Sequence, residues 1–136
     1  MNAKEYMKQI RTIDLKVLAI KEEIAEIRAV LGVQAINYDK IPGTSNGIDK
    51  TFQLICKLID RQDELMQEYM LLSDTKQDVK QVLFKLSRQV YAELLYKRYF
   101  EFKKWAVIGE EMFYSEDNTK LLHRKALEEV ERLINT

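Results

Sequence analysis

The chain has 136 residues, which is room for one ordinary domain or two very small ones. Its 22 basic and 22 acidic side chains cancel, which argues against a polybasic nucleic-acid coat and against a protein held on a membrane surface by charge. Four glycines and one proline are too few for a β-sandwich or barrel, and one cysteine with one histidine excludes an internal disulfide and a structural zinc site.

The first thirty residues carry an unbroken heptad pattern of apolar side chains. Its members alternate at spacings of four and three: Tyr6, Ile10, Ile13, Val17, Ile20, Ile24, Ile27 and Leu31. The pattern predicts a helix from about Ala3 to Leu31, ~43 Å long, whose apolar seam needs a partner helix. No stretch here is apolar for long enough to be a signal peptide or to span a bilayer, so we expect no membrane association and a cytoplasmic location.

A loop and a second helix follow. Gly32 is expected to end the first helix, and the stretch from Gly32 to Gly47 has loop composition, with three glycines and Pro42. A second helix is predicted to begin near Ile48. One heptad stripe on it contains a lone polar residue, a feature that often sets register or partner number: Ile48, Phe52, Ile55, Ile59, Gln62, Met66 and Tyr69.

An adjoining leucine stripe lies on the same helix, formed by Leu54, Leu58, Leu65 and Leu72, so the helix is expected to bury two faces. The heptads fit either an internal hairpin with the first helix or a coiled coil between chains; the loop length favours the hairpin, and the surplus apolar surface favours a dimer as well. Cys56 is interpreted as a small core residue.

The second helix is predicted to end at a turn formed by Ser73, Asp74 and Thr75, which can also cap a third helix. The third helix would direct Val79 and Leu83 inward. After Leu86 aromatic side chains become frequent, which is typical of a compact core. We therefore place a boundary near residue 87 and predict an assembly region over 1–86 and a separate domain over 87–136.

The last fifty residues predict three shorter helices, and the whole chain is predicted to be all-α. One would run to about Phe100, a short one would span about Lys104 to Met112, and the last would start after Ser115. Ser115 can cap that helix, and Glu116 lies in the first turn, where the helix dipole favours an acid. A helix, a tight turn and a serine-capped helix are typical of a helix-turn-helix.

Residues in this half resemble a family of phage proteins. The resemblance is carried by Arg98-Tyr99, Lys103, Trp105, Ile108, Glu110-Glu111, Tyr114-Ser115-Glu116, Leu122-His123 and Ala126-Leu127. They are similar to the C-terminal half of the small ArpU-like and RinA-like regulators of phage late transcription. In that family this half is similar to region 4 of sigma factors, which reads promoter DNA. The long heptad-bearing N-terminal half also looks like the helical leader of that family.

The resemblance implies a recognition helix over Ser115 to Lys125 that enters the major groove of duplex DNA. It further implies that Lys103 and Lys104 lie near phosphates. The residues then expected at the DNA are Lys103, Lys104, Ser115, Lys120, Leu121, Arg124 and Lys125.

Several residues depart from the family pattern. Phe113 and Phe102 stand where turns of the family usually have glycine, and a bulky side chain at positive φ is strained, so either the turn is altered or Phe113 is an exposed hydrophobe. Gly109 replaces the usual alanine in a helix interior, at a cost of roughly 0.5–1 kcal/mol. Leu121 takes an outward position where a polar or basic residue is common. From Arg88 onward the basic and acidic residues are equal in number, which predicts weak DNA binding by a single copy.

Two polar residues have competing interpretations. Arg98 could contact a phosphate or pair with Glu110 or Glu111 within the chain. His123 has no acid or cysteine at ligand spacing and is expected to be a buried or half-buried structural residue. The tyrosines and the tryptophan could stack on bases but, at helical spacing, are expected in the core.

No motif supports catalysis, because the glycines are scattered and no serine or cysteine has a histidine placed by a motif; we expect no enzyme, cofactor or metal. The prediction is a phage- or prophage-encoded transcription regulator in a bacterial host that binds double-stranded DNA as a homodimer or higher oligomer. One alternative is a protein-interaction module with a degenerate helix-turn-helix that binds RNA polymerase or another host or phage protein. Another is a purely structural coiled-coil oligomer.

Overall fold

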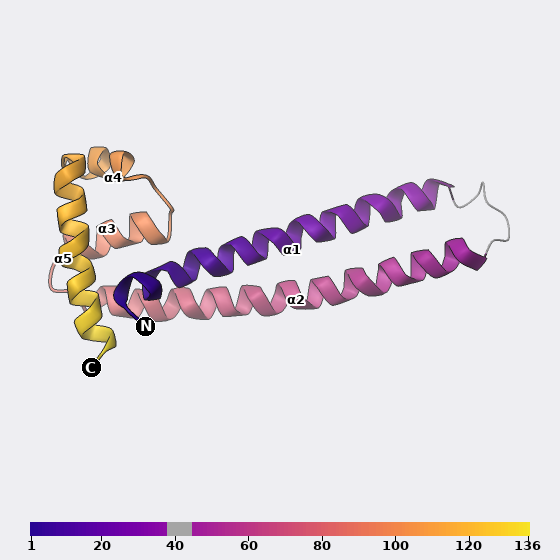
Figure 1. Cartoon of the computed structure of the whole chain (residues 1–136), viewed down its shortest axis with the longest axis horizontal. Helices are drawn as coiled ribbons and strands as arrows, with labels where there is room; N and C mark the ends of the chain where they lie inside the picture. Colours follow the sequence, from indigo (N-terminus) through magenta and orange to yellow (C-terminus); the bar gives the residue numbers. More distant parts are fainter. Residues whose placement is uncertain (38–44) are drawn as a thin grey trace. The chain divides into compact units, whose positions relative to one another are not determined.

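The computed structural model describes residues 1–37 and 45–136, and within them it has five α-helices and no strand (Figure 1). The all-α prediction is confirmed. The helices are α1 (Ala3–Asn37), α2 (Ser45–Phe84), α3 (Gln89–Tyr99), α4 (Trp105–Met112) and α5 (Glu116–Ile134). No helix in this described part is both long and apolar enough to cross a membrane.

The chain forms two compact units. One contains residues 15–71, which are the middle of the α1–α2 hairpin, and we call it the hairpin unit. The other contains residues 1–14 and 72–136, and we call it the C-terminal unit. The C-terminal unit therefore includes the start of α1 and the end of α2 as well as α3, α4 and α5.

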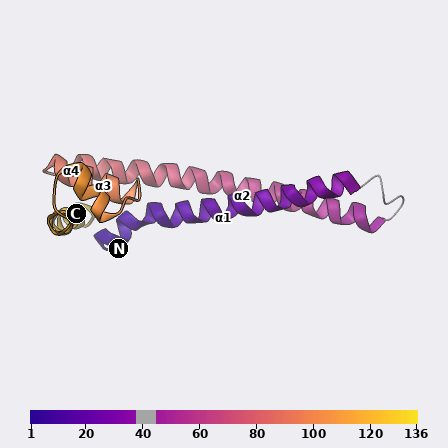
Figure 2. The same ribbon diagram turned by 90° about the horizontal axis from the view of Figure 1, so that it is seen from above.

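In the hairpin unit α1 and α2 run antiparallel, side by side (Figures 1 and 2). The heptad seam predicted on the first helix is the face that α1 buries: Val17, Ile20, Ile24 and Ile27 are all at most 5 % exposed. The two helices are also joined by ion pairs, Lys16–Glu68 at 2.9 Å and Arg61–Glu23 at 3.1 Å. The internal hairpin is thus the pairing that the single chain forms.

The stripe by which α2 faces α1 is not the one that only Gln62 interrupts. Leu54, Leu58 and Leu65 are half-buried together with Arg61 and Glu68 between them, at the same alternating spacing of four and three. The stripe expected to form the first seam lies outside and is exposed: Phe52, Ile55, Ile59, Gln62, Met66 and Tyr69. α2 thus packs against α1 through the stripe that holds Arg61 and Glu68, which pair with Glu23 and Lys16. The partner expected for its second face is not among the described residues. Cys56 is likewise exposed and not in the core.

Both long helices continue past the ends predicted for them. α1 passes through Gly32 to Asn37, since one exposed glycine costs a helix only about 1 kcal/mol. α2 begins at Ser45 and continues without a break through residues 73–75, where a turn was expected. That segment has no glycine or proline to force a turn, and Leu72 and Val79 on either side stay buried. Residues 38–44, the rest of the predicted loop, lie outside the described residues.

The C-terminal unit has a mixed helical core. Met7 and Ile10 of α1 and Val79 of α2 are fully buried. The end of α3, both ends of α4 and the start of α5 lie within a residue or two of the positions expected from the sequence. The fully buried side chains of these helices include Leu94, Leu95, Ile108, Ala126 and Val130. The break between α2 and α3 falls at residues 85–88, inside the C-terminal unit.

The Glu129 side chain of α5 fixes the turn between α2 and α3. The Ser87 backbone N–H and the Ser87 hydroxyl both donate to the carboxylate of Glu129, the hydroxyl at 2.9 Å. At the start of the chain, Asn2 accepts from the Glu5 N–H at 2.8 Å and so caps α1. Polar side chains therefore define both the start of α1 and the turn that brings α3 onto the core.

Candidate nucleic-acid interface

Helices α4 and α5 form a helix-turn-helix joined by Phe113, Tyr114 and Ser115. The Tyr114 N–H donates to the Gly109 carbonyl at 2.8 Å, which closes the end of α4. The Ser115 hydroxyl accepts from the Asn118 N–H at 3.1 Å and so caps α5, as its position before an acidic first turn predicted. The buried Thr119 hydroxyl donates to the Ser115 carbonyl at 2.8 Å. The first turn of α5 is thus held by its own backbone and by two hydroxyls.

Gly109 allows α4 and α5 to approach each other closely. A Cβ atom at this position would lie 2.8 Å from the Tyr114 carbonyl oxygen and 3.1 Å from the Thr119 hydroxyl. The interpretation of Gly109 as only a cost to helix stability is therefore incomplete. The residue has no side chain because the backbone of the turn occupies the space where one would be.

The turn keeps its left-handed residue even though that residue is phenylalanine. Phe113 has φ 62° and ψ 39°, and Phe102, before α4, has φ 57°. Both positions were expected to favour glycine. Phe102 is half-buried beneath the Arg11 guanidinium, 4.6 Å from the ring centroid, whereas Phe113 is 93 % exposed. Of the two possibilities left open for Phe113, the exposed hydrophobe is the one found.

Replacing Phe113 with glycine is expected to stabilise the C-terminal unit by about 1 kcal/mol. The left-handed conformation costs an L-residue about 1–2 kcal/mol, of which the greater backbone freedom of unfolded glycine returns a part. The exposed ring has little packing to lose. Thermal unfolding followed by circular dichroism measures the change, with Phe113→Ala as a control that keeps the strain. A glycine variant that unfolds at a lower temperature than the alanine variant would contradict the expectation.

The outward face of α5 displays most of the side chains that were expected to contact DNA. Thr119, Leu122 and Ala126 point into the core, and apart from the half-buried His123 the side chains between them face out. The exposed set is Lys120, Leu121, Arg124 and Lys125. Lys120 forms a 3.5 Å pair with Glu116 one turn earlier, a contact of small energy at this exposure. Arg124 and Lys125 have no ion-pair partner among the residues that the structure describes.

The two lysines before α4 differ in their availability. Lys103 Nζ lies 2.9 Å from Glu111 and 3.1 Å from Glu101, and the bonds to these carboxylates raise its pKa. Lys97 also binds Glu111, at 2.7 Å, and together the two lysines lower the pKa of that carboxyl. Lys104 is the exposed residue immediately before α4. Lys103 is thus part of an ion-pair network, whereas Lys104 has no ion-pair partner among the residues that the structure describes.

Arg98 stabilises the helix-turn-helix through contacts within the C-terminal unit. Its guanidinium donates to the Lys103 carbonyl at 2.9 Å and stacks over the Trp105 ring, 4.3 Å from the ring centroid. A pair with Glu110 or Glu111, one of the two interpretations of Arg98, is not among its contacts in the described residues. The planar, always charged guanidinium suits this double role.

His123 is half-buried between aromatic rings. Its Nε2 is hydrogen-bonded to the Tyr99 hydroxyl at 2.7 Å, and Trp105 packs against it edge-on at 4.5 Å. Burial, and then the charges of Arg98 and Lys4, lower its pKa to about 4. The ring is therefore neutral at pH 7, which agrees with the structural role expected for it.

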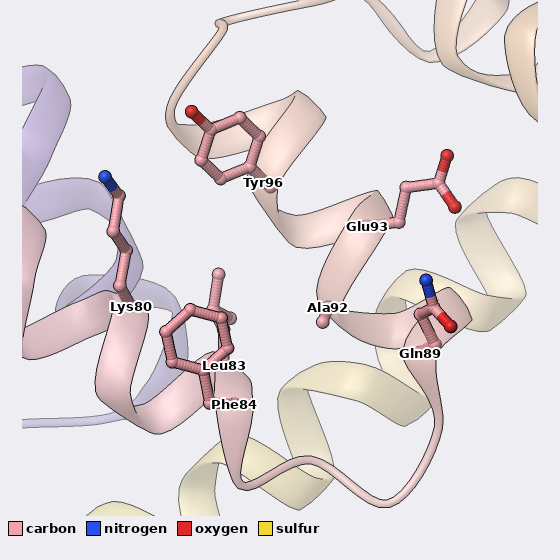
Figure 3. A pocket seen from close by; sticks show the side chains of 7 residues that line it. All are labelled: Lys80, Leu83, Phe84, Gln89, Ala92, Glu93 and Tyr96. Atoms are coloured by element: carbon pink, nitrogen blue, oxygen red, sulfur yellow. The ribbon is translucent and has the colours of Figure 1, made fainter.

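Sequence reasoning missed an apolar groove between α2 and α3. It has a cavity volume of about 540 Å³ and is lined by Lys80, Leu83, Phe84, Gln89, Ala92, Glu93 and Tyr96 (Figure 3). Phe84, at the end of α2, is 83 % exposed, and Tyr96 stacks on Phe100 with ring centroids 4.7 Å apart. No sequence signal marks this groove, because it exists only through the angle of the turn at 85–88.

Family models, curated proteins and solved structures were compared with this chain, and none of them matches it.

Proposed function

We propose that the protein is a phage- or prophage-encoded transcription regulator that binds duplex DNA as an oligomer. The observation that carries the proposal is the serine-capped helix α5, which follows a three-residue turn and presents Lys120, Arg124 and Lys125 on its outward face. An α-helix fits the major groove, and lysine and arginine bind guanine edges and phosphates there. The resemblance to the ArpU-like and RinA-like regulators supports the same function.

The electrostatics limit what one copy can do. The chain has no net charge, and the expected phosphate contact Lys103 is engaged by Glu101 and Glu111. Since phosphate neutralisation supplies most of the affinity of DNA-binding proteins, a single copy would bind weakly. Two copies on one DNA gain effective concentration from each other, so oligomerisation belongs to the proposed function.

Selection from a random duplex-DNA pool tests the proposal, with binding of the selected DNA then measured by fluorescence anisotropy. Lys120→Ala/Arg124→Ala is expected to weaken binding about 100-fold and to flatten the salt dependence by about two units of slope. The charge-matched control is Lys85→Ala/Arg132→Ala, which removes two exposed cations outside the first turns of α5. Equal binding by the two double variants, or no motif selected by the wild type, would overturn the proposal.

A second candidate function is suggested by Phe113. Phe113 is strained and 93 % exposed at the tip of the helix-turn-helix, so its ring contributes little to packing, and exposed aromatic residues often anchor protein contacts. The partner proposed for this case is RNA polymerase. Binding to the purified polymerase would then be lost with Phe113→Ala and kept with Lys120→Ala/Arg124→Ala. The opposite pattern would reject this candidate.

A further inference from the structure

We infer that two copies of this chain pair in parallel through the outer stripe of α2, which is Phe52, Ile55, Ile59, Gln62, Met66 and Tyr69. All six residues lie in the hairpin unit and repeat at spacings of three and four. The dimer would supply the oligomer that the proposed DNA-binding function requires, and the biological role of the dimer rests on that proposed function. The experiments that test the dimer contain no DNA, so a failure to dimerise can be told apart from a failure to bind DNA.

The outer stripe has the spacing of a coiled-coil seam, and among the described residues no other helix covers it. Its five apolar side chains are between 38 % and 66 % exposed, although α2 already packs against α1 through a different face. A soluble monomer rarely exposes a contiguous apolar surface of this kind, and its spacing matches the heptad of a helix that packs against another helix. The surface thus fits a helix with the same repeat, and α2 of a second copy has it.

Gln62 favours a parallel register. In a parallel pair each seam residue faces its own copy, so the two Gln62 amides meet and can hydrogen-bond with each other. In the antiparallel pair that keeps the seam in register, position 52 faces 69, position 55 faces 66 and position 59 faces 62. Gln62 would then be buried against Ile59, with its amide unpaired, which is costly.

The charges beside the outer stripe favour the same register. On one edge lies α1, whose Lys21 Nζ is 5.0 Å from the centroid of the Tyr69 ring and whose Arg28 follows one heptad later. On the other edge lies Asp63 of α2. A two-fold axis parallel to the helices sets the basic edge of each copy against the acidic edge of the other. A two-fold axis perpendicular to them would set like charges together.

The first measurement is the mass of the full chain in solution over a wide range of micromolar concentrations, by sedimentation or light scattering. The wild type is expected to be a dimer, and Ile59→Glu is expected to weaken it at least about 100-fold, because two carboxylates would meet in the seam. The matched control is Leu15→Glu on α1. Leu15 is 50 % exposed and Ile59 52 %, so the two changes carry equal risk to folding, which circular dichroism checks.

A disulfide test measures the direction of pairing. In a Cys56→Ser background, Phe52→Cys brings two thiols together only in the parallel dimer. In the antiparallel register they are ~26 Å apart, far beyond the reach of a disulfide. There, instead, Phe52→Cys would cross-link to Tyr69→Cys when the two variants are mixed.

Each outcome is decisive. A dimer that Ile59→Glu breaks and Leu15→Glu preserves, with cross-linking of position 52 to itself, supports the parallel pair. A monomeric wild type, a dimer equally resistant or equally sensitive to both glutamates, or cross-linking only between positions 52 and 69 would overturn it. A monomer that still selects a DNA motif would reject the dimer and leave DNA binding intact.

Discussion

Gly109→Ala is expected to destabilise the C-terminal unit by about 1–2 kcal/mol. The new methyl group would lie 2.8 Å from the Tyr114 carbonyl oxygen, a backbone atom that cannot move without opening the turn. Overpacking of this kind costs about 1–3 kcal/mol, and the better helix propensity of alanine returns about 1 kcal/mol. Urea unfolding followed by the fluorescence of Trp105, the only tryptophan, reports on this unit.

Gly32→Ala is the matched control for that substitution. Gly32 also lies inside a helix, but a Cβ there would meet nothing within 4 Å. Alanine at position 32 is therefore expected to stabilise α1 by up to about 1 kcal/mol, measured by circular dichroism. If both alanines stabilise the protein, the close approach of α4 and the turn is not tight enough to matter. Opposite signs support the packing described here.

Lowering the pH from 7 to 4 is expected to destabilise the C-terminal unit through His123. Its pKa is about 4 in the folded chain and about 6.5 when unfolded, so between these values only the unfolded chain binds the proton. Stability is therefore lost as the pH falls through this window, with no further loss from this group below pH 4. The full difference corresponds to about 3 kcal/mol, which solvent screening of the half-buried ring reduces to about 2 kcal/mol.

The titration of His123 can be followed directly, because it is the only histidine in the chain. Its ring proton resonances give the folded pKa by NMR. His123→Gln keeps a side chain able to hydrogen-bond with Tyr99 and cannot titrate, so the difference in unfolding free energy between wild type and variant should shrink by about 2 kcal/mol from pH 7 to pH 4. A measured pKa near 6.5 or a constant difference would contradict the buried, neutral ring.

The two stripes of α2 show why apolar periodicity alone could not tell which of them packs against α1. The outer stripe has the more regular apolar pattern, because only Gln62 interrupts it. The stripe that packs against α1 contains the charged residues Arg61 and Glu68. A charged seam residue is costly unless it meets an opposite charge. Glu23 and Lys16 meet that condition, but they lie about forty and fifty residues away along the chain. The pairing depends on the register of the hairpin, which no local pattern contains.

In the helix-turn-helix, the features predicted correctly were local ones. The Ser115 cap and the exposure of Phe113, one of the two possibilities left open for it, depend on residues within one turn of each other. The contacts of Lys103 and Arg98 could not be predicted in the same way. Each could reach several partners, and the fold selected Glu111 for one and the Trp105 ring for the other.

The sequence by itself determined the all-α class, the buried seam of α1, the end of α3, the bounds of α4, the start of α5 and the turn before α5. These features depend on side-chain periodicity and capping, which act over a few residues. Only the tertiary structure decided which face of α2 stays outside, why Gly109 has no side chain, and why His123 is neutral. Each of these depends on atoms from segments far apart in the chain, and their energies arise from close packing and desolvation once those segments meet.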